Sequence, residues 1–295
     1  MVSIRRKTRI GEWTPFGKKT RIGEWTPFGK NENRGPMRKR YFFFDYDGTL
    51  ALPRSYTIPE SARKTLEALR NNGHFIALAT GRLQCNALDY IDSMGIDNLV
   101  ADGGYSVTIE GELKWMIPLP IEAVRACLRR LDAAGIHWAV TTRNEQVRFS
   151  PQPDFAIVAG DYYVPTVYDP AVTAESVKTV FKVYIPCKQG ADQDRLIASG
   201  VLDGVPWARY NSDNIFVEPT DKKLGIKRMM DMLGAPYEDV VVFGDGTNDI
   251  TMFTPEWTSI AMGNAVPELK ERATFVTADV DKDGLARACE HFGWI

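Results

Sequence analysis

Two acidic residues at the end of an apolar run are the first feature of this sequence that could carry out chemistry. Asp45 and Asp47 stand one residue apart, directly after the aromatic run 41–44 and before Gly48 and Thr49. Strand side chains alternate between faces, so we expect both carboxylates to point to the same side. Neighbouring carboxylates repel each other unless a cation binds or one of them holds a proton, and both situations serve catalysis. The pair therefore indicates a cation site or an acid/base pair, although Asp-x-Asp-Gly is also an ordinary solvated turn.

The segments that must position this pair alternate between strand and helix patterns. Apolar runs predict buried strands at residues 41–44, 74–79 and 98–101, and helical periodicity predicts a helix after each of the first two. This alternation is typical of a parallel sheet covered by helices, in which ligands bind beyond the carboxyl ends of the strands. Asp45, Thr80 and Asp102 follow the three strands, so we expect one shared site.

The pattern changes from Pro118 to about Trp207. A Pro-Leu-Pro linker is followed by a helix, adjacent strands and a Pro-rich region that is expected to be irregular, which favours an α+β insert. Several polar or aromatic side chains of this segment could contact a substrate, but such residues more often belong to a surface or a core. They are His137, Trp138, Arg143, Arg148 and the pair Tyr162-Tyr163.

The strand and helix alternation is expected to resume from residue 208. A short strand at 215–219 leads to Lys222, which opens a helical pattern, and the apolar run 239–243 predicts another buried strand. That run stops at Gly244-Asp245-Gly246-Thr247-Asn248-Asp249, a second polar turn after a buried strand. Each of these motifs taken singly is also compatible with an ordinary turn or a solvated charge.

The order of the motifs along the chain indicates a function more specifically than any single motif does. Asp-x-Asp-Gly-Thr from Asp45, Thr80 at a second strand end, Lys222 at a helix start and the Gly-Asp-x-x-Asn-Asp turn follow one another. This order resembles the haloacid dehalogenase-like (HAD) superfamily of phosphohydrolases, and within it the Cof-type branch, over residues 37–295. One departure is Asp-Gly-Gly at 102–104, where many relatives have Asn-Gly-Ala.

The resemblance implies an α/β fold. The expected core is a doubly wound parallel sheet (Rossmann-like) made of residues 37–117 and 208–295, and the expected inserted α+β cap spans residues 118–207. Such a cap would close over the site, exclude water and choose the leaving group.

The resemblance also implies roles for the acidic residues. Asp45 would be the nucleophile that forms an aspartyl-phosphate, and Asp47 would protonate the leaving group and then deprotonate the attacking water. Asp45, Asp245 and Asp249, with the backbone carbonyl of Asp47, would bind Mg²⁺, because this set offers only hard oxygen ligands.

The remaining site residues are expected to hold the phosphate. Thr80 and the backbone N–H of Gly81 would bind phosphoryl oxygens, and Lys222 would offset the charge of the nucleophile and the transferring group. Asn248 is a further candidate for phosphate contact. The resemblance implies that the catalytic residues are Asp45, Asp47, Thr80 and Lys222.

We therefore expect a Mg²⁺-dependent phosphatase that acts on a small phosphorylated metabolite, either a sugar phosphate or a phosphorylated cofactor. Ion-pumping ATPases resemble the same core but carry Lys at the position of Asp47, so Asp47 favours water as the acceptor. One alternative is a phosphotransferase or phosphomutase acting on sugar phosphates. The other, from a different class, is a non-catalytic regulator that binds a phosphometabolite, although such a binder would not need Asp47.

Composition limits the other possibilities. The 295 residues have a net charge of −2, 44% hydrophobic residues, four scattered cysteines and three histidines, which gives no indication of a zinc site or of nucleic-acid binding. No apolar run is long enough to span a bilayer. We therefore expect a cytoplasmic protein whose partner is a small phosphate ester, with neither a membrane nor a nucleic acid.

Residues 1–36 differ from the rest. They carry nine Lys or Arg and three Glu, a net charge of +6, which leaves −8 for residues 37–295. Residues 7–18 recur without change as residues 19–30, whereas repeats that fold are usually longer and diverge in sequence. We expect this basic duplicated head to be disordered or non-native, with Met37 as a plausible true start; a nucleic-acid-binding arm is the functional alternative.

Overall fold

Strand β1 (Tyr41–Phe44) lies inside a sheet with the order β14-β13-β12-β1-β2-β3-β4-β5 in the computed structural model. The structure describes residues 38–295 except 54, 93, 161–163 and 211, so the duplicated head and the Tyr162-Tyr163 pair lie outside the described residues. The strands from β14 to β3 are parallel, and β4 and β5 are antiparallel. The other strands of this sheet are β2 (Phe75–Ala79), β3 (Leu99–Ala101), β4 (Ser106–Ile109), β5 (Glu112–Met116), β12 (Val240–Gly244), β13 (Thr258–Ala261) and β14 (Phe275–Val276).

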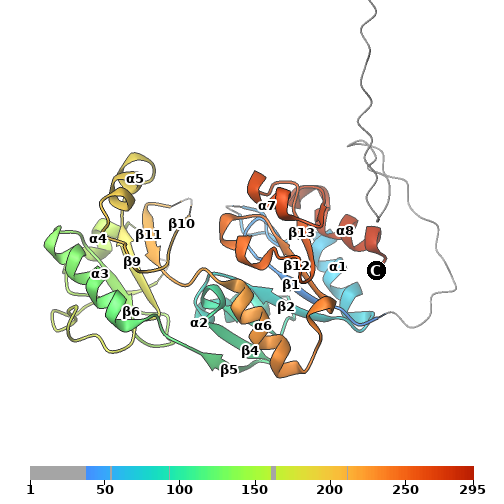
Figure 1. Cartoon of the computed structure of the whole chain (residues 1–295), viewed down its shortest axis with the longest axis horizontal. Coiled ribbons are helices and arrows are strands. Elements are labelled where there is room, and N and C mark those ends of the chain that lie inside the picture. The colour runs from blue at the N-terminus through green and yellow to red at the C-terminus, as the bar shows by residue number, and fades with distance from the viewer. Residues whose placement is uncertain (1–37, 54, 93, 161–163, 211) are drawn as a thin grey trace, which may run out of the picture. The chain divides into compact units, whose positions relative to one another are not determined.

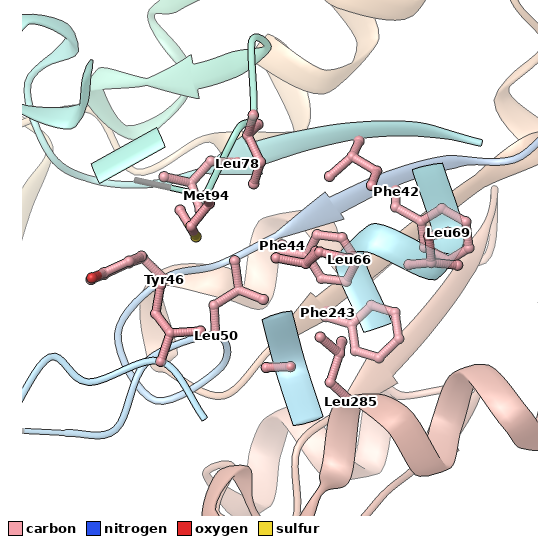
Figure 2. Packing of buried hydrophobic residues seen from close by; sticks show 14 of the residues in the cluster. Phe42, Phe44, Tyr46, Leu50, Leu66, Leu69, Leu78, Met94, Phe243 and Leu285 are labelled. Carbon is pink, nitrogen blue, oxygen red and sulfur yellow. The ribbon is translucent and has the colours of Figure 1, made fainter. Parts of the chain in front are cut away.

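Helices cover both faces of this sheet because the strands are apolar on both sides. Phe42 and Phe44 of β1 pack in one buried cluster with Leu66 and Leu285 (Figure 2), and Phe43 packs in a second cluster with Met229. The first face is covered by α1 (Glu60–Asn71), α2 (Gln84–Asp92) and α8 (Gly284–Phe292), and the second by α6 (Lys222–Leu233) and α7 (Pro267–Arg272).

Four short 3-10 helices complete this part of the chain. They are η1 (Asp102–Gly104), η2 (Tyr237–Asp239), η3 (Thr247–Met252) and η4 (Val280–Lys282). In the part of the chain that the structure describes, none of the helices combines the length and the apolar character that a membrane crossing requires.

The strand order reverses direction between β1 and β12. From β1 the chain proceeds to β2 and β3 on one side, whereas β12 pairs with the other edge of β1 and leads to β13 and β14. Such a switch point leaves a crevice at the carboxyl ends of the two strands, where doubly wound folds bind their ligands. Asp45 follows β1 and Asp245 follows β12, so the sheet itself brings these two carboxylates to the crevice.

A second sheet has the order β10-β11-β9-β6-β7-β8. Its strands are β6 (Ala139–Thr141), β7 (Arg148–Ser150), β8 (Thr166–Tyr168), β9 (Lys182–Pro186), β10 (Trp207–Arg209) and β11 (Asn214–Val217). Its helices are α3 (Ile121–Ala133), α4 (Phe155–Ala159) and α5 (Ala191–Ala198), and they lie with β6, β9 and β11 apart from β1, β2 and β12 (Figure 1). Leu128 of α3 and Val140, Val183 and Ile215 of the sheet share one buried cluster. The prediction of a parallel core with an α+β insert is confirmed.

The prediction for residues 208–217 is wrong in one respect. The strand expected to resume the core sheet is β11, which pairs antiparallel with β9 and β10 in the second sheet. An apolar run such as 215–217 fits either sheet equally well, so its pattern alone does not say which partner it takes. The Pro-rich region expected to be irregular likewise contains α4 and β8. The domain limit at 117/118 remains a prediction, whereas the second sheet continues past the predicted limit at 207/208 through β11.

The Asp102-Gly103-Gly104 turn packs against the segment that connects the second sheet to α6. All three residues have positive φ, and Gly104 has a φ of 108°. A Cβ on Gly103 would collide with the Pro219 carbonyl oxygen, and one on Gly104 would collide with the Asp221 carbonyl oxygen. Glycine at both positions therefore lets the segment before α6 pass close to η1, which positions the first residue of α6, Lys222.

Candidate active site

Three carboxylates meet at the carboxyl end of the core sheet. Asp45 follows β1, Asp245 follows β12 and Asp249 lies in η3, and each offers an oxygen within 4.8 Å of the others. Asp45 and Asp249 are buried. The Asp249 Oδ2 accepts hydrogen bonds of 2.9 Å from the backbone N–H groups of Asp245 and Gly246, which holds this acid at the start of η3. The structure thus brings together the three acids that were predicted to bind a metal.

Lys222 supplies a positive charge beneath these acids. Its Nζ lies 2.5 Å from the Asp45 Oδ1 and 2.6 Å from the Asp249 Oδ1, and its side chain is 1% exposed. Lys222 is the first residue of α6, and the Asp221 carboxylate caps the helix by accepting a hydrogen bond from the Leu224 N–H. This cap fixes the helix start, and with it the direction of the lysine side chain.

Asp245 is held by two residues that the sequence analysis did not select. Thr49 donates its hydroxyl to the Asp245 Oδ1 at 2.9 Å, and the Asn264 amide donates to the Asp245 Oδ2 at 3.3 Å and to the Gly48 carbonyl at 2.8 Å. The signal for Thr49 was its place in the Asp-x-Asp-Gly-Thr motif. Asn264 stood in a Gly-Asn turn after a strand, which is a weaker signal.

Burial and mutual repulsion shift the ionisation of this cluster. Burial, and then the charge of Asp249, raise the pKa of Asp45 well above its usual range and raise the pKa of Asp245 to about 7. Burial alone would lower the pKa of Lys222, but the attraction of Asp249 and Asp45 outweighs it and raises the pKa. One buried ammonium therefore faces three acids, which is too little positive charge for all three to ionise easily.

This arrangement fits a divalent cation. The donor set consists of carboxylate oxygens, which suit Mg²⁺ better than they suit a metal that prefers nitrogen or sulfur ligands. Burial first, and repulsion by Asp249 second, raise the pKa values of Asp45 and Asp245, and a dication among the acids would favour their charged forms.

Asp47 does not join the buried cluster. Its side chain is 48% exposed and contacts Arg82, whose Nη2 lies 3.0 Å from each of the two carboxylate oxygens. The Arg82 guanidinium lies among the rings of Tyr46, Tyr56 and Tyr90, at 5.6, 5.5 and 4.4 Å from their centroids. Asp47 is thus a solvated acid held by Arg82, whereas Asp45 is a buried acid.

A cavity of about 1190 Å³ opens above these groups. Six of the predicted site residues line it, and the other two, Lys222 and Asp249, lie buried beneath it. The lining residues from the prediction are Asp45, Asp47, Thr80, Gly81, Asp245 and Asn248.

The second sheet and its loops form the opposite wall of the cavity. Lys182, Tyr210 and Phe216 line it there, together with polar residues of the loops near α5. Of the insert residues considered in the sequence, Trp138 and Arg148 are buried and His137 pairs with Asp154 at 2.9 Å, and none of these three lines the cavity. The sequence did not predict these wall residues because their position depends on how β9, β10 and β11 pair in the second sheet. One signal was available: the acidic residue Glu218 directly follows an apolar strand.

The model of the haloacid dehalogenase-like hydrolase family matches residues 42–289. The chain belongs to this family. YkrA of Bacillus subtilis is 32% identical over 258 residues, which cover 87% of this chain and 99% of YkrA. The 5-amino-6-(5-phospho-D-ribitylamino)uracil phosphatase YwtE of the same organism is 40% identical over 269 residues, which cover 82% of this chain and 94% of YwtE.

A solved structure of this superfamily has a similar fold. The chain resembles BT4131, described as a HAD subclass IIB sugar phosphatase, with a TM-score of 0.70 and 27% identity over 87% of this chain and 100% of BT4131. The family match and these relatives show that the protein is a hydrolase acting on phosphate esters.

Proposed function

We propose that this protein is a Mg²⁺-dependent phosphatase that hydrolyses a small phosphorylated metabolite through an aspartyl-phosphate on Asp45. The observation that carries the proposal is the meeting of Asp45, Asp245 and Asp249 with Lys222 at the switch point between β1 and β12. Phosphate monoesters are among the slowest biological molecules to hydrolyse unaided, and their enzymes reach accelerations of ~10²¹. A site for this reaction needs a positioned nucleophile and strong compensation of negative charge.

In the first step, an Asp45 carboxylate oxygen attacks phosphorus and the bond from phosphorus to the ester oxygen breaks. The leaving alkoxide takes a proton from Asp47. Lys222 touches Asp45 directly and offsets the charge that the nucleophile and the phosphoryl group bring together.

In the second step, water attacks the phosphorus of the aspartyl-phosphate, gives a proton to Asp47 and releases inorganic phosphate, which restores Asp45. Asp47 serves as acid and then as base, which agrees with its exposed position at the cavity and its distance from the buried cluster. Its contact with Arg82 would hold the carboxylate ready between the two steps.

The phosphoryl oxygens are proposed to bind at Thr80, at the backbone N–H of Gly81 and at Asn248, which line the cavity beside Asp45. Mg²⁺ would be held by Asp45, Asp245 and Asp249, with the backbone carbonyl of Asp47, and would neutralise phosphate charge when bound. Thr49 and Asn264 orient Asp245 for this role.

The proposed substrate is a sugar phosphate or a phosphorylated cofactor. The cavity is large enough for such a molecule, and its far wall offers both aromatic and polar side chains. YwtE, named for a phosphorylated ribitylamino compound, and the sugar phosphatase BT4131 support this range. We propose the cytoplasm as the compartment, where the four free cysteines would stay reduced.

The test is phosphate release from a panel of sugar phosphates, nucleotides, flavin mononucleotide and pyridoxal phosphate, with Mg²⁺ or with EDTA. Asp45→Asn should lower the turnover rate by ~10⁴-fold or more, because it removes the nucleophile while preserving shape. EDTA should abolish turnover of the parent, and added Mg²⁺ should restore it. Asp281→Asn, at an exposed acid of η4, is the matched control and should keep the parent rate.

Phosphate release by Asp45→Asn at the parent rate would rule out the aspartyl-phosphate route. Activity that appears only with a sugar bisphosphate activator would favour the phosphomutase alternative. A folded protein that binds Mg²⁺ but releases no phosphate from any substrate would favour a binding regulator.

A further inference from the structure

The insert carries a buried ion pair that faces the cavity and has no part in the proposed phosphoryl transfer. Lys182 of β9 pairs with Glu218, which follows β11, and their side chains are 7% and 2% exposed. Removing two charges from water is costly, and their attraction often does no more than compensate for it. Such a pair adds little to stability, so its position at the cavity points to a role in binding.

Glu218 also accepts a hydrogen bond from the Tyr210 hydroxyl. One carboxylate oxygen takes this hydrogen bond and the other faces Lys182. Burial, and then the charge of Glu218, raise the pKa of Tyr210 well above its usual range, so the phenol stays protonated. A phenol has a single proton to donate. Because the Tyr210 hydroxyl directs that proton to Glu218, its oxygen can act only as an acceptor toward the cavity.

The Tyr210 hydroxyl lies at the phosphate-binding end of the cavity. Its oxygen is 2.7 Å from the position that a Cβ on Gly81 would occupy, and Gly81 directly follows Thr80. Tyr210, Gly81 and Thr80 line the same cavity. The tyrosine ring packs beside that of Phe216, with 5.7 Å between centroids, which supports it from the insert. An atom that meets this oxygen therefore belongs to the part of the leaving group nearest the phosphate.

We propose that Tyr210 selects substrates by accepting a hydrogen bond from a hydroxyl group on the carbon next to the one that bears the phosphate ester. This inference rests on the proposed function and narrows its substrate class to phosphate esters of sugars and other polyols. An ester without that hydroxyl fills the cavity and excludes water but gives the Tyr210 oxygen no donor, which lowers the rate of turnover of that ester. Glu218 acts as a positioning residue that fixes the direction of the tyrosine proton, and Lys182 holds Glu218.

The test compares glycerol 3-phosphate with 3-hydroxypropyl phosphate, which lacks only the neighbouring hydroxyl. In Mg²⁺ buffer, the parent should have the higher kcat/KM for glycerol 3-phosphate. Tyr210→Phe should lower that value about tenfold and change kcat/KM for 3-hydroxypropyl phosphate less than about twofold, because only one hydrogen bond is lost. Tyr168→Phe makes the same substitution at an exposed position of β8 outside the cavity lining, and it should preserve both values.

Glu218→Gln tests the positioning role. A glutamine amide can donate to the Tyr210 oxygen, which would occupy the acceptor and turn the phenol proton elsewhere. The preference for glycerol 3-phosphate should therefore fall as it does in Tyr210→Phe, and the double variant should lose no more than either single variant. A general structural defect would instead lower kcat/KM equally for both substrates.

Equal losses on the two substrates, or a parent without preference for glycerol 3-phosphate, would overturn the inference. The proposed function would stand in that case if Asp45→Asn abolishes hydrolysis of both esters. If Asp45→Asn instead retains hydrolysis, the proposed function fails, and the inference about its leaving group fails with it.

Discussion

Arg82 links the loop after β2 to the exposed acid Asp47. Its guanidinium covers both carboxylate oxygens of Asp47, donates to the Tyr90 hydroxyl at 3.1 Å, and lies among three tyrosine rings. Arginine suits this place because its planar head can stack on rings and still present several N–H groups. The carboxylate is thus held at the cavity in one orientation, which suits its proposed role in proton transfer.

At the residue scale, we predict that Arg82→Met lowers kcat about tenfold on any substrate that the parent hydrolyses, while KM changes less. The loss follows from the freedom that Asp47 gains, since misplacement of an acid/base group affects proton transfer more than binding. Steady-state kinetics at saturating Mg²⁺ would measure it. Arg82→Lys should have an intermediate kcat, and Arg287→Met, at an exposed position of α8, should match the parent. An unchanged kcat in Arg82→Met would contradict this role.

Residues of this kind mark a limit of sequence reasoning. Asp45 and Asp245 could be predicted as partners because each directly follows a buried strand, and adjacent parallel strands bring such ends together. Arg82 follows Thr80 and Gly81 in the chain but gains its role from three tyrosines in two other segments. A local pattern does not contain that information.

At the element scale, α6 must approach the sheet closely to deliver Lys222. Gly225 lies one turn into this helix, and a Cβ there would come within 2.8 Å of the Gly104 carbonyl oxygen and would overlap Val100 of β3. Both neighbours have little room to move, because one is backbone and the other is a side chain of a buried strand. The glycine is therefore the point where the helix touches the core.

We predict that Gly225→Ala lowers the free energy of unfolding by about 1–3 kcal/mol, because it overpacks this contact. It should also reduce kcat, since α6 carries Lys222 into contact with Asp45. Urea unfolding followed by circular dichroism would measure the first effect. Met232→Ala, on the exposed side of α6, should change stability by no more than about 0.5 kcal/mol. A parent-like midpoint for Gly225→Ala would show that α6 has more room than its neighbours indicate.

Strands differ in how well their pairing partners can be predicted from the sequence. β1 and β12 were predictable as buried parallel strands from their uninterrupted apolar runs. β11 has a similar run but pairs with β9, and its assignment to the core was wrong. The choice depends on the antiparallel register of Ile215 with Ile185, a contact between residues far apart in the chain. Tyr210 and Glu218, which flank β11, were missed for the same reason.

At the scale of the whole molecule, buried acids make stability depend on pH. Asp102 is fully buried in η1, where its Oδ2 accepts from the Ser106 hydroxyl and the Gln84 N–H. Burial raises the pKa of Asp102 from 3.8 to about 6. The folded protein therefore binds this proton more tightly than the unfolded chain. The resulting stabilisation is complete below about pH 4 and is lost as the pH rises through about 6.

We predict that Asp102→Asn gains stability relative to the parent by about 3 kcal/mol between pH 4 and pH 7, because asparagine does not titrate. Asparagine also tolerates the positive φ of this position. Urea unfolding of both proteins at several pH values would measure the difference. Asp97→Asn, at an exposed acid, is the matched control. A flat difference for Asp102→Asn would mean that Asp102 ionises normally in the folded state.

The pairing of β1 with β12 also has a consequence for the order in which the protein is made. Tyr41 lies beside Val240, so about 200 residues must leave the ribosome before that edge of β1 meets its partner. At ~5–20 residues per second, the wait is roughly 10–40 s. During this time a strand of four aromatic residues has an open edge, which is a hazard for aggregation. The nascent chain therefore has most need of a chaperone until β12 emerges, when only its last fifty-five or so residues remain, and Asp45 meets Lys222 only shortly before then.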